Sequence, residues 1–228
     1  MATALTSWHK YIFPWIEGLP EPAFLNAVRD ALIEFCEQTL MLTETLTAIT
    51  VIANTSSYSL TGVGTTESRI MNVENAKYKP NGADNTQYKS LYPLSRLQED
   101  RHQQGNWLFQ TAEEPTHFYV YQQTPATLNL WPIPTEGSTS GLLVRVNLRP
   151  LDTATSVEDF LYNFHRRTIS NGALARLFAQ KAMPWYDPQL AVYYRDMFDE
   201  RVNNEKLNKI TGATNLGLRV RMRKGIAL

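Results

Sequence analysis

The spacing of apolar residues changes twice along this chain of 228 residues. Over residues 21–42 apolar side chains recur at intervals of three and four, which predicts an amphipathic helix of about five turns. From residue 43 to residue 150 the apolar residues fall in short alternating or β-branched runs, which predict strands. The helical spacing returns after Pro150. In any fold of this chain the first helix must therefore pack against helices that lie about 110 residues further along the sequence.

The predicted first helix has a clear start and one apolar face. Pro20 and Pro22 suit the first turn of a helix, where a missing backbone N–H costs nothing. Cys36 is the only cysteine in the chain, so no intrachain disulfide can form, and we predict that its thiol is a small core group. The apolar face comprises Phe24, Leu25, Val28, Ala31, Leu32, Phe35 and Cys36.

The middle region predicts about six to eight antiparallel strands in a small sandwich or barrel. Segments rich in Gly, Pro, Asn and Ser separate its apolar runs, as is typical of turns between strands. Over residues 141–150 the apolar residues alternate with Arg145 and Asn147, which predicts a strand with one apolar face. Residues 94–104 predict a helical turn or short helix within this region. The alternating apolar residues are Leu142, Val144, Val146 and Leu148.

Two further helices are predicted after Pro150. Residues 156–159 fit a capping box at the start of the first one, and Pro184 marks its end. Asp187 and Pro188 fit the N-cap and first position of the second one, which we expect from residue 188 to 210, with Gly212 as its stop. The apolar residues expected to face inward are Phe160, Leu161, Phe164, Leu174, Leu177, Phe178, Ala191, Tyr194, Met197, Phe198 and Val202.

These elements predict an α+β fold: a small α-helical bundle with an inserted antiparallel β domain and an extended C-terminal arm. The expected divisions are residues 1–42, 43–150, 151–211 and 212–228. The small side chains of Gly172, Ala173 and Ala175 leave room for another backbone to approach closely.

The C-terminal arm combines apolar and cationic residues in strict alternation. In an extended strand, one face would carry the apolar residues and the other the arginines. A lone strand of this length is unstable in water, which leaves three interpretations: a frayed basic tail, a strand within the chain, or a strand docked on a partner. The residues are Leu218, Arg219, Val220, Arg221, Met222, Arg223 and Lys224.

The net charge argues against a protein that grips duplex DNA. Lys and Arg number 22 and so do Asp and Glu, whereas phosphate binding normally needs a basic excess. The four cations of the arm leave the rest of the chain about four charges negative, so the basic character is local. No stretch approaches the ~20 apolar residues that span a bilayer, and no secretion signal is evident, so we expect a soluble protein made inside the cell, without a membrane partner.

Signatures of catalysis, metal binding and cofactor binding are absent from the sequence, which predicts a protein that is not an enzyme. The histidines, His9, His102, His117 and His165, stand far apart, and His165 is interpreted as a surface or interface residue. The carboxylates Glu99, Asp100, Glu113 and Glu114 would support a hydrolase only if two faced each other across a cleft. We interpret them as solvated loop charges.

The aromatic residues of the β region support an alternative function. Trp107, Tyr119, Tyr121 and Trp131 lie on predicted strands or near turns, where rings can stack on sugars. A glycan-binding β module is therefore the alternative to the interpretation below. Filling the core of a small β domain, or contacting another subunit, is the simpler role for such rings.

Two segments resemble a known family. Residues 13–39, "FPWIEGLPEPAFLNAVRDALIEFCEQT", are similar to the opening of tailed-bacteriophage head–tail adaptor (connector) proteins, in which a P-x-P precedes an A-x-R-x-A-x-x-E-F-C type helix. Residues 171–202 resemble the helical hairpin of the same family. The two segments cover about a quarter of the chain, and their motifs concern packing rather than chemistry.

The resemblance implies a structural virion protein at the head–tail junction, made in the host cytoplasm. It implies a ring of many copies, commonly twelve, that binds the portal protein above and the tail nozzle or tube below. Genomic DNA would pass through the lumen without sequence-specific binding. The arm residues 218–224 would dock on the portal. Subunit packing would involve Gly172, Ala173, Ala175, Arg176 and Trp185.

Overall fold

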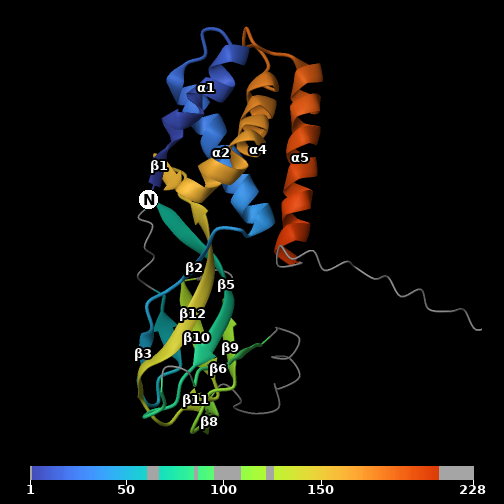
Figure 1. The fold of residues 1–228 in the computed structure, drawn as a ribbon. Coiled ribbons are helices and arrows are strands. Elements are labelled where there is room, and N and C mark those ends of the chain that lie inside the picture. Colours follow the sequence, from blue (N-terminus) through green and yellow to red (C-terminus); the bar gives the residue numbers. More distant parts are fainter. Residues whose placement is uncertain (1, 61–66, 85–86, 95–108, 122–125, 211–228) are drawn as a thin grey trace, which may run out of the picture.

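The computed structural model describes residues 2–60, 67–84, 87–94, 109–121 and 126–210 (Figure 1). The predicted C-terminal arm, Gly212, and all but the first residue of the helical turn predicted at 94–104 lie outside these ranges. The chain has a mixed α+β fold, as the sequence predicts. Figure 1 shows the helices gathered at one end of the molecule and most of the strands at the other.

Three long helices pack against one another: α2 (Glu21–Thr39), α4 (Asp159–Phe178) and α5 (Pro188–Ile210). The predicted position of α2 is confirmed, with Pro20 as N-cap and Pro22 in the first turn. Cys36 is fully buried, as predicted, and burial together with the charge of Glu37 raises the pKa of its thiol to about 12. The thiol is therefore a packing group and not a nucleophile.

The start of α5 is also as predicted. The Asp187 carboxylate accepts hydrogen bonds from the backbone N–H groups of Gln189 at 2.9 Å and Leu190 at 3.1 Å. These bonds satisfy two amides that the first turn of a helix leaves free. Tyr194, Phe198 and Val202 are buried on the inner side of the helix.

The N-terminal residues form elements that the sequence analysis missed. They are β1 (Ala2–Ala4), η1 (Leu5–Trp8), α1 (His9–Ile12) and η2 (Phe13–Trp15). Their buried side chains follow one another at intervals of three or four, a helical spacing that could have revealed them. The buried residues are Leu5, Trp8, Ile12, Ile16 and Leu19.

Strands occupy the region from Thr43 to Pro150. Two sheets have the orders β2-β12-β5-β6, with β3 also on β12, and β4-β10-β9-β7. The strands are β2 (Thr43–Thr45), β3 (Ile49–Val51), β4 (Ser57–Ser59), β5 (Ser68–Tyr78), β6 (Lys89–Ser90), β7 (Tyr92–Pro93), β8 (Thr111–Ala112), β9 (His117–Val120), β10 (Thr127–Trp131), β11 (Ile133–Pro134) and β12 (Ser138–Pro150).

The predicted alternation on β12 is confirmed, and its apolar face enters the main hydrophobic core. Leu142, Val144, Val146 and Leu148 are each at most 1% exposed. They share one cluster of buried residues with Leu128 and Leu130 of the second sheet and with the helices. The sequence prediction was wrong on two points: there are more than eight strands, and β7–β9 and β8–β11 pair in parallel. Ladders of two residues are too short to show a period.

The capping box predicted at residues 156–159 is wrong. Ser156–Glu158 forms strand β13, which pairs with β1, and α4 begins at Asp159 without a side-chain cap. The backbone amide and hydroxyl of Ser156 both donate to the Glu67 carboxylate, at 2.5 and 2.9 Å. A carboxylate distant in sequence therefore engages the amide and hydroxyl of Ser156 that a capping box would use.

Two details of α4 also differ from prediction. The helix ends at Phe178 and not at Pro184. A series of turns then connects it to α5. Phe164 is 80% exposed and does not face the core. The other predicted apolar residues of α4 are buried or partly buried in the core.

The three long helices approach one another closely at Gly172. A β-carbon at this position would lie 2.8 Å from the Phe198 ring and 3.1 Å from the Ala31 β-carbon. Phe198 and Ala31 are both fully buried, so neither has space to move away. Glycine is therefore what allows α4 to pack against α2 and α5 at this distance.

Replacing Gly172 by alanine should lower the free energy of unfolding by about 1–3 kcal/mol, because overpacking outweighs the gain of about 1 kcal/mol in helix propensity. Urea denaturation monitored by circular dichroism measures this change. The adjacent Asn171→Ala is the control, since it raises helix propensity outside the tight contact. Equal or greater stability of Gly172→Ala than of the native chain would contradict this account.

Candidate functional site

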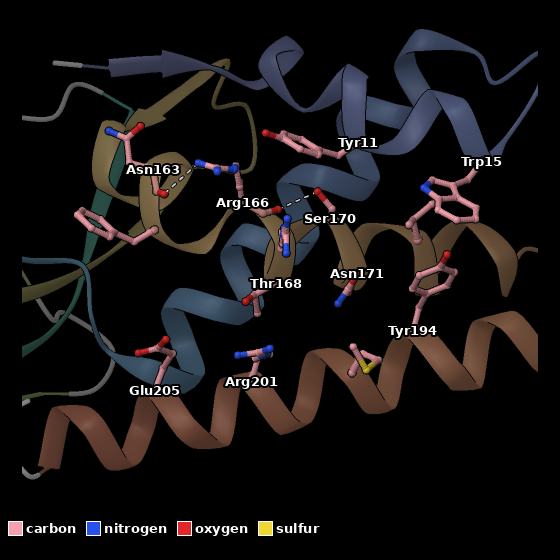
Figure 2. Close-up of a pocket in the computed structure, with 14 residues that line it drawn as sticks. Tyr11, Trp15, Asn163, Arg166, Thr168, Ser170, Asn171, Tyr194, Arg201 and Glu205 are labelled. Carbon is pink, nitrogen blue, oxygen red and sulfur yellow. Dashed lines mark hydrogen bonds between the residues drawn. The ribbon is translucent and has the colours of Figure 1, made fainter.

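A groove of about 550 Å³ runs between the N-terminal helices, α4 and α5 (Figure 2). We call it the helical groove. Figure 2 shows Trp15 and Tyr194 near one end, Asn163 and Glu205 near the other, and Arg201 between them on α5. Its lining comprises Tyr11, Trp15, Asn163, Phe164, Arg166, Arg167, Thr168, Ser170, Asn171, Leu174, Tyr194, Met197, Arg201 and Glu205.

Contacts from the N-terminal helices fix one wall of the groove. The Trp8 indole N–H donates to the backbone oxygen of Arg166 at 3.2 Å, and the Ser170 hydroxyl donates to the same oxygen at 2.7 Å. The Arg166 guanidinium lies 6.0 Å from the Tyr11 ring centroid, within range of a cation–π contact. The first residues of the chain thereby hold the exposed side of α4 in place.

The groove carries a positive charge. Three arginines, Arg166, Arg167 and Arg201, line it with a single carboxylate, Glu205. Arg167 and Arg201 are both exposed, and neither forms an ion pair with another residue of the described ranges. A cationic surface without intrachain partners is suited to an acidic partner.

His165 lies behind the groove, so the prediction of a surface or interface histidine is wrong. It is 5% exposed, its ring centroid is 4.9 Å from that of Phe35, and its Nδ1 is 3.7 Å from the Glu205 carboxylate. Burial lowers the pKa of the imidazole, although the charge of Glu205 opposes this shift. A neutral, packed histidine follows, and nothing in its surroundings forms a catalytic pair.

Two large apolar side chains project at the groove. Phe164 is 80% exposed and Trp15 is 62% exposed. The Trp15 ring centroid lies 6.3 Å from that of Tyr194. Exposed rings of this size beside unpaired cations are typical of a protein–protein contact surface.

A second, apolar hollow of about 320 Å³ lies on another side of the α4–α5 pair. Two of the predicted subunit-packing residues, Ala175 and Arg176, line it. The small side chains of Ala179 and Ala191 account for its depth. The full lining is Ala175, Arg176, Ala179, Ala191, Val192, Arg195 and Asp196.

The other predicted subunit-packing residues have different surroundings. Gly172 and Ala173 are buried by helices of the same chain. Trp185 is half-buried against the core, and its buried indole N–H has no hydrogen-bond acceptor in the described part of the chain. A role of these five residues in subunit packing stays a prediction.

Glu34 on α2 joins the three long helices through two arginines. Its carboxylate accepts hydrogen bonds from Arg195 of α5 at 2.6 and 3.1 Å and from Arg176 of α4. Burial opposes ionisation of this carboxyl, but the hydrogen bonds and charges of Arg195 and Arg176 outweigh it and lower its pKa below the ordinary 4.5. The carboxylate therefore stays charged between the helices at neutral pH.

The structure brings together only some of the aromatic residues proposed for glycan binding. Tyr119 and Tyr121 make an edge-to-face contact at 5.5 Å; Tyr119 is 9% exposed, whereas Tyr121 is 48% exposed. Both line a hollow of about 230 Å³ in the strand region. Trp131 is half-buried, and its ring centroid lies 5.4 Å from that of His117. Trp107 lies outside the described residues. The alternative, a glycan-binding β module of a virion or tail component, therefore stays a prediction.

The carboxylates considered for hydrolysis do not form a facing pair where they can be placed. Glu114 forms an ion pair with Lys89 at 2.5 Å, and Glu113 is exposed beside it. Glu99, Asp100 and the arm residues 218–224 lie outside the described residues.

The described residues contain no cluster of three or more metal-ligating side chains. Within the same ranges, none of the helices combines the length and the apolar content that crossing a bilayer requires. The helical part carries the cationic groove, the apolar hollow and the exposed rings of Trp15 and Phe164, and the strand region also exposes the rings of Tyr92, Phe109 and Tyr121.

Comparison with known proteins gives one match. A protein-family model described as SU10 adaptor protein matches residues 11–223, which include the three long helices, strands β2 to β13 and part of the arm. A search of curated proteins finds no match.

Replacing Glu34 by glutamine should lower the free energy of unfolding by about 1–2 kcal/mol at pH 7, because both arginines lose their counter-charge in a partly solvated site. A carboxyl with a depressed pKa contributes stability above its unfolded pKa and loses it as pH falls through the folded value. The difference between the two chains should therefore fade below pH ~4.5, as urea denaturation at a series of pH values can show.

The exposed Glu17 provides the control, since it forms no ion pair with any described residue. Glu17→Gln should leave stability unchanged. Native-like stability of Glu34→Gln at neutral pH would show that the cluster does not hold the helices together.

Proposed function

The chain belongs to the SU10 adaptor protein family, a family of phage head–tail adaptors, and from this membership we propose that it forms an adaptor ring between portal and tail. The resemblance noted in the sequence is thereby confirmed. A structural adaptor of a tailed bacteriophage is the function that the family indicates. The bridging of portal and tail, the ring and the ejection channel are our proposals.

The observation that carries the proposal is the extent of the family match. The resemblance in sequence covered only residues 13–39 and 171–202, whereas the match runs continuously from residue 11 to residue 223. It therefore spans the strands and reaches most of the cationic arm. Exposed rings and unpaired charges on the helical part support a protein that is completed by neighbours.

The role proposed is structural rather than catalytic. Copies of the chain, commonly twelve in the family, would surround a lumen through which genomic DNA passes during ejection. A chain with no net charge suits such a conduit, because strong cations around the lumen would retain DNA. The ring would bind the portal protein on one side and the tail nozzle or tube on the other, at the head–tail junction of the virion, after synthesis in the host cytoplasm.

The arm is proposed to attach the ring to the portal. Within the described residues the last buried side chain is that of Val202, and we propose that the arm beyond α5 serves a contact with another protein. Docked as a strand on the portal, Leu218, Val220 and Met222 would gain apolar partners and the arginines would gain acidic ones.

The ring itself is the first test. Light scattering after size exclusion, with and without purified portal, should give the mass of a multi-copy assembly at least when the portal is present. Electron microscopy should then show a ring coaxial with the portal. A chain that stays monomeric and fails to bind the portal would refute the proposed function.

Deleting residues 217–228 should leave the far-ultraviolet circular dichroism spectrum and thermal unfolding unchanged, because the role proposed for this segment is to bind the portal and not to pack against its own chain. Co-sedimentation with the portal should fall by at least about tenfold, since the docking strand is lost.

A chain in which a Gly-Ser sequence of equal length replaces residues 217–228 is the matched control for chain length, and it should also fail to bind. Reversing Arg219, Arg221 and Arg223 to glutamate separates the charge contribution from the apolar one. Native-like attachment of the truncated chain would rule out docking by the arm.

A further inference from the structure

We propose that neighbouring copies of this chain contact each other head to tail, with the outer face of α5 of one copy seated against the helical groove of the next. The outer face is the side of α5 directed away from α2 and α4; Val192, Tyr193, Asp196 and Glu200 lie on it. The inference rests on the proposed function, because it names the two surfaces that build the proposed ring.

The charges of the two surfaces are complementary. Asp196 and Glu200 are exposed one helical turn apart, so their carboxylates lie on the same side of α5. The helical groove presents Arg167 and Arg201, which are exposed as well. None of these four side chains forms an ion pair with another described residue. In the assembled pair, each acidic side chain of one copy gains a guanidinium of the next.

The apolar features are complementary in shape. Trp15 projects beside the groove with 62% of its surface exposed. The apolar hollow beside the outer face has a floor of small side chains, Ala175, Ala179 and Ala191, and a volume of about 320 Å³. An indole ring of one copy can fill the hollow of the next, which removes both exposed apolar surfaces from water. The hollow also contains Arg176, one of the residues predicted to pack subunits.

The heights of these features along α5 agree with rotational symmetry. If the ring axis is roughly parallel to α5, rotation about it does not shift a copy along the axis. Two features that touch across the contact must therefore lie at equal height along α5. At the N-terminal end Trp15 lies beside Tyr194, level with the hollow that spans Ala191 to Asp196. At the centre Arg201 follows Glu200 directly. The indole and the hollow thus lie at similar heights along α5, and Glu200 and Arg201 differ by about 1.5 Å in height, over a groove that follows α5 for about 17 Å.

The contact is heterologous, since it joins two different surfaces of the same chain. Such a contact leaves one free copy of each surface in any open assembly, so it continues until the ring closes and does not stop at a dimer. An isologous contact between two grooves would instead place arginines against arginines.

Two other occupants fit the groove less well. The arm carries four cations and no carboxylate over residues 218–224, so the arginines of the groove repel it. DNA would meet three arginines, but also Glu205 and the projecting rings of Trp15 and Phe164, which fit a protein surface better. A second copy satisfies both the charges and the rings.

Charge exchange tests the contact. The full chain with Asp196→Arg and Glu200→Arg, and the full chain with Arg167→Glu and Arg201→Glu, should each need at least about tenfold more protein for half-assembly, because like charges then face each other. An equimolar mixture of the two variants should assemble at the native concentration, since each outer face then meets a groove of opposite charge. Light scattering in the presence of portal measures assembly in every case.

The controls separate the contact from folding and from the proposed function. Asp84→Arg with Glu136→Arg, both exposed in the strand region, should assemble like the native chain. Thermal unfolding should show that all variants are folded.

If the native chain forms rings and both charge-reversed variants assemble equally well, the proposed contact is overturned while the proposed function stays intact. A failure of the mixture to restore assembly would also overturn it. Loss of DNA binding in the Arg167→Glu, Arg201→Glu chain with normal assembly would assign the groove to nucleic acid instead. Absence of rings from the native chain, with and without portal, would instead refute the proposed function.

Discussion

The close approach of α2, α4 and α5 at Gly172 is the constraint on which the rest of the structure depends. With no side chain at this position, the Phe198 ring and the Ala31 methyl group fill the space between the helices. The carboxylate of Glu34 then reaches Arg176 and Arg195 on the other two helices. Because the helices are held at this distance, the α4–α5 pair presents a groove on one side and a hollow on another.

Polar contacts at the base of the helices join them to the strands. The Lys209 ammonium near the end of α5 donates to the Asn147 side chain of β12 at 3.1 Å and to the backbone oxygen of Leu40, which follows α2. Arg149 of β12 forms an ion pair with Glu37 of α2 at 2.5 Å. Together with the continuous hydrophobic cluster, these contacts fix the orientation of the sheet against the helices. Long-range contacts of this kind offset the entropy of closing a loop of about 110 residues.

The same geometry explains why the chain suits a repeated assembly. Among the described residues, its helical surface leaves several arginines and carboxylates without ion pairs and exposes the rings of Trp15 and Phe164. Asp196 and Glu200 lie on the outer face of α5, whereas Arg167 of α4 and Arg201 of α5 line the groove, and these four groups form no ion pair with one another within one copy. In the proposed contact a neighbouring copy supplies the opposite charges, and this asymmetry would favour a closed ring over a symmetric pair. Membership in an adaptor family and the surface chemistry therefore point in the same direction.

The sequence by itself determined the elements whose signals are local. The start of α2 at its prolines, the cap of α5 at Asp187, the burial of Cys36 and the alternation on β12 depend on spacing over a few residues, and all four are found as predicted. The sequence analysis was wrong in placing Ser156 in a capping box, His165 at the surface or an interface, and Phe164 in the core. The positions of Ser156 and His165 depend on partners distant in the chain, Glu67 for Ser156 and Phe35 and Glu205 for His165. Only the tertiary structure shows that Arg167 and Arg201 line one groove. The spacing of apolar residues assigns a residue to the buried or the exposed face of its helix, but it does not show which element packs against that face.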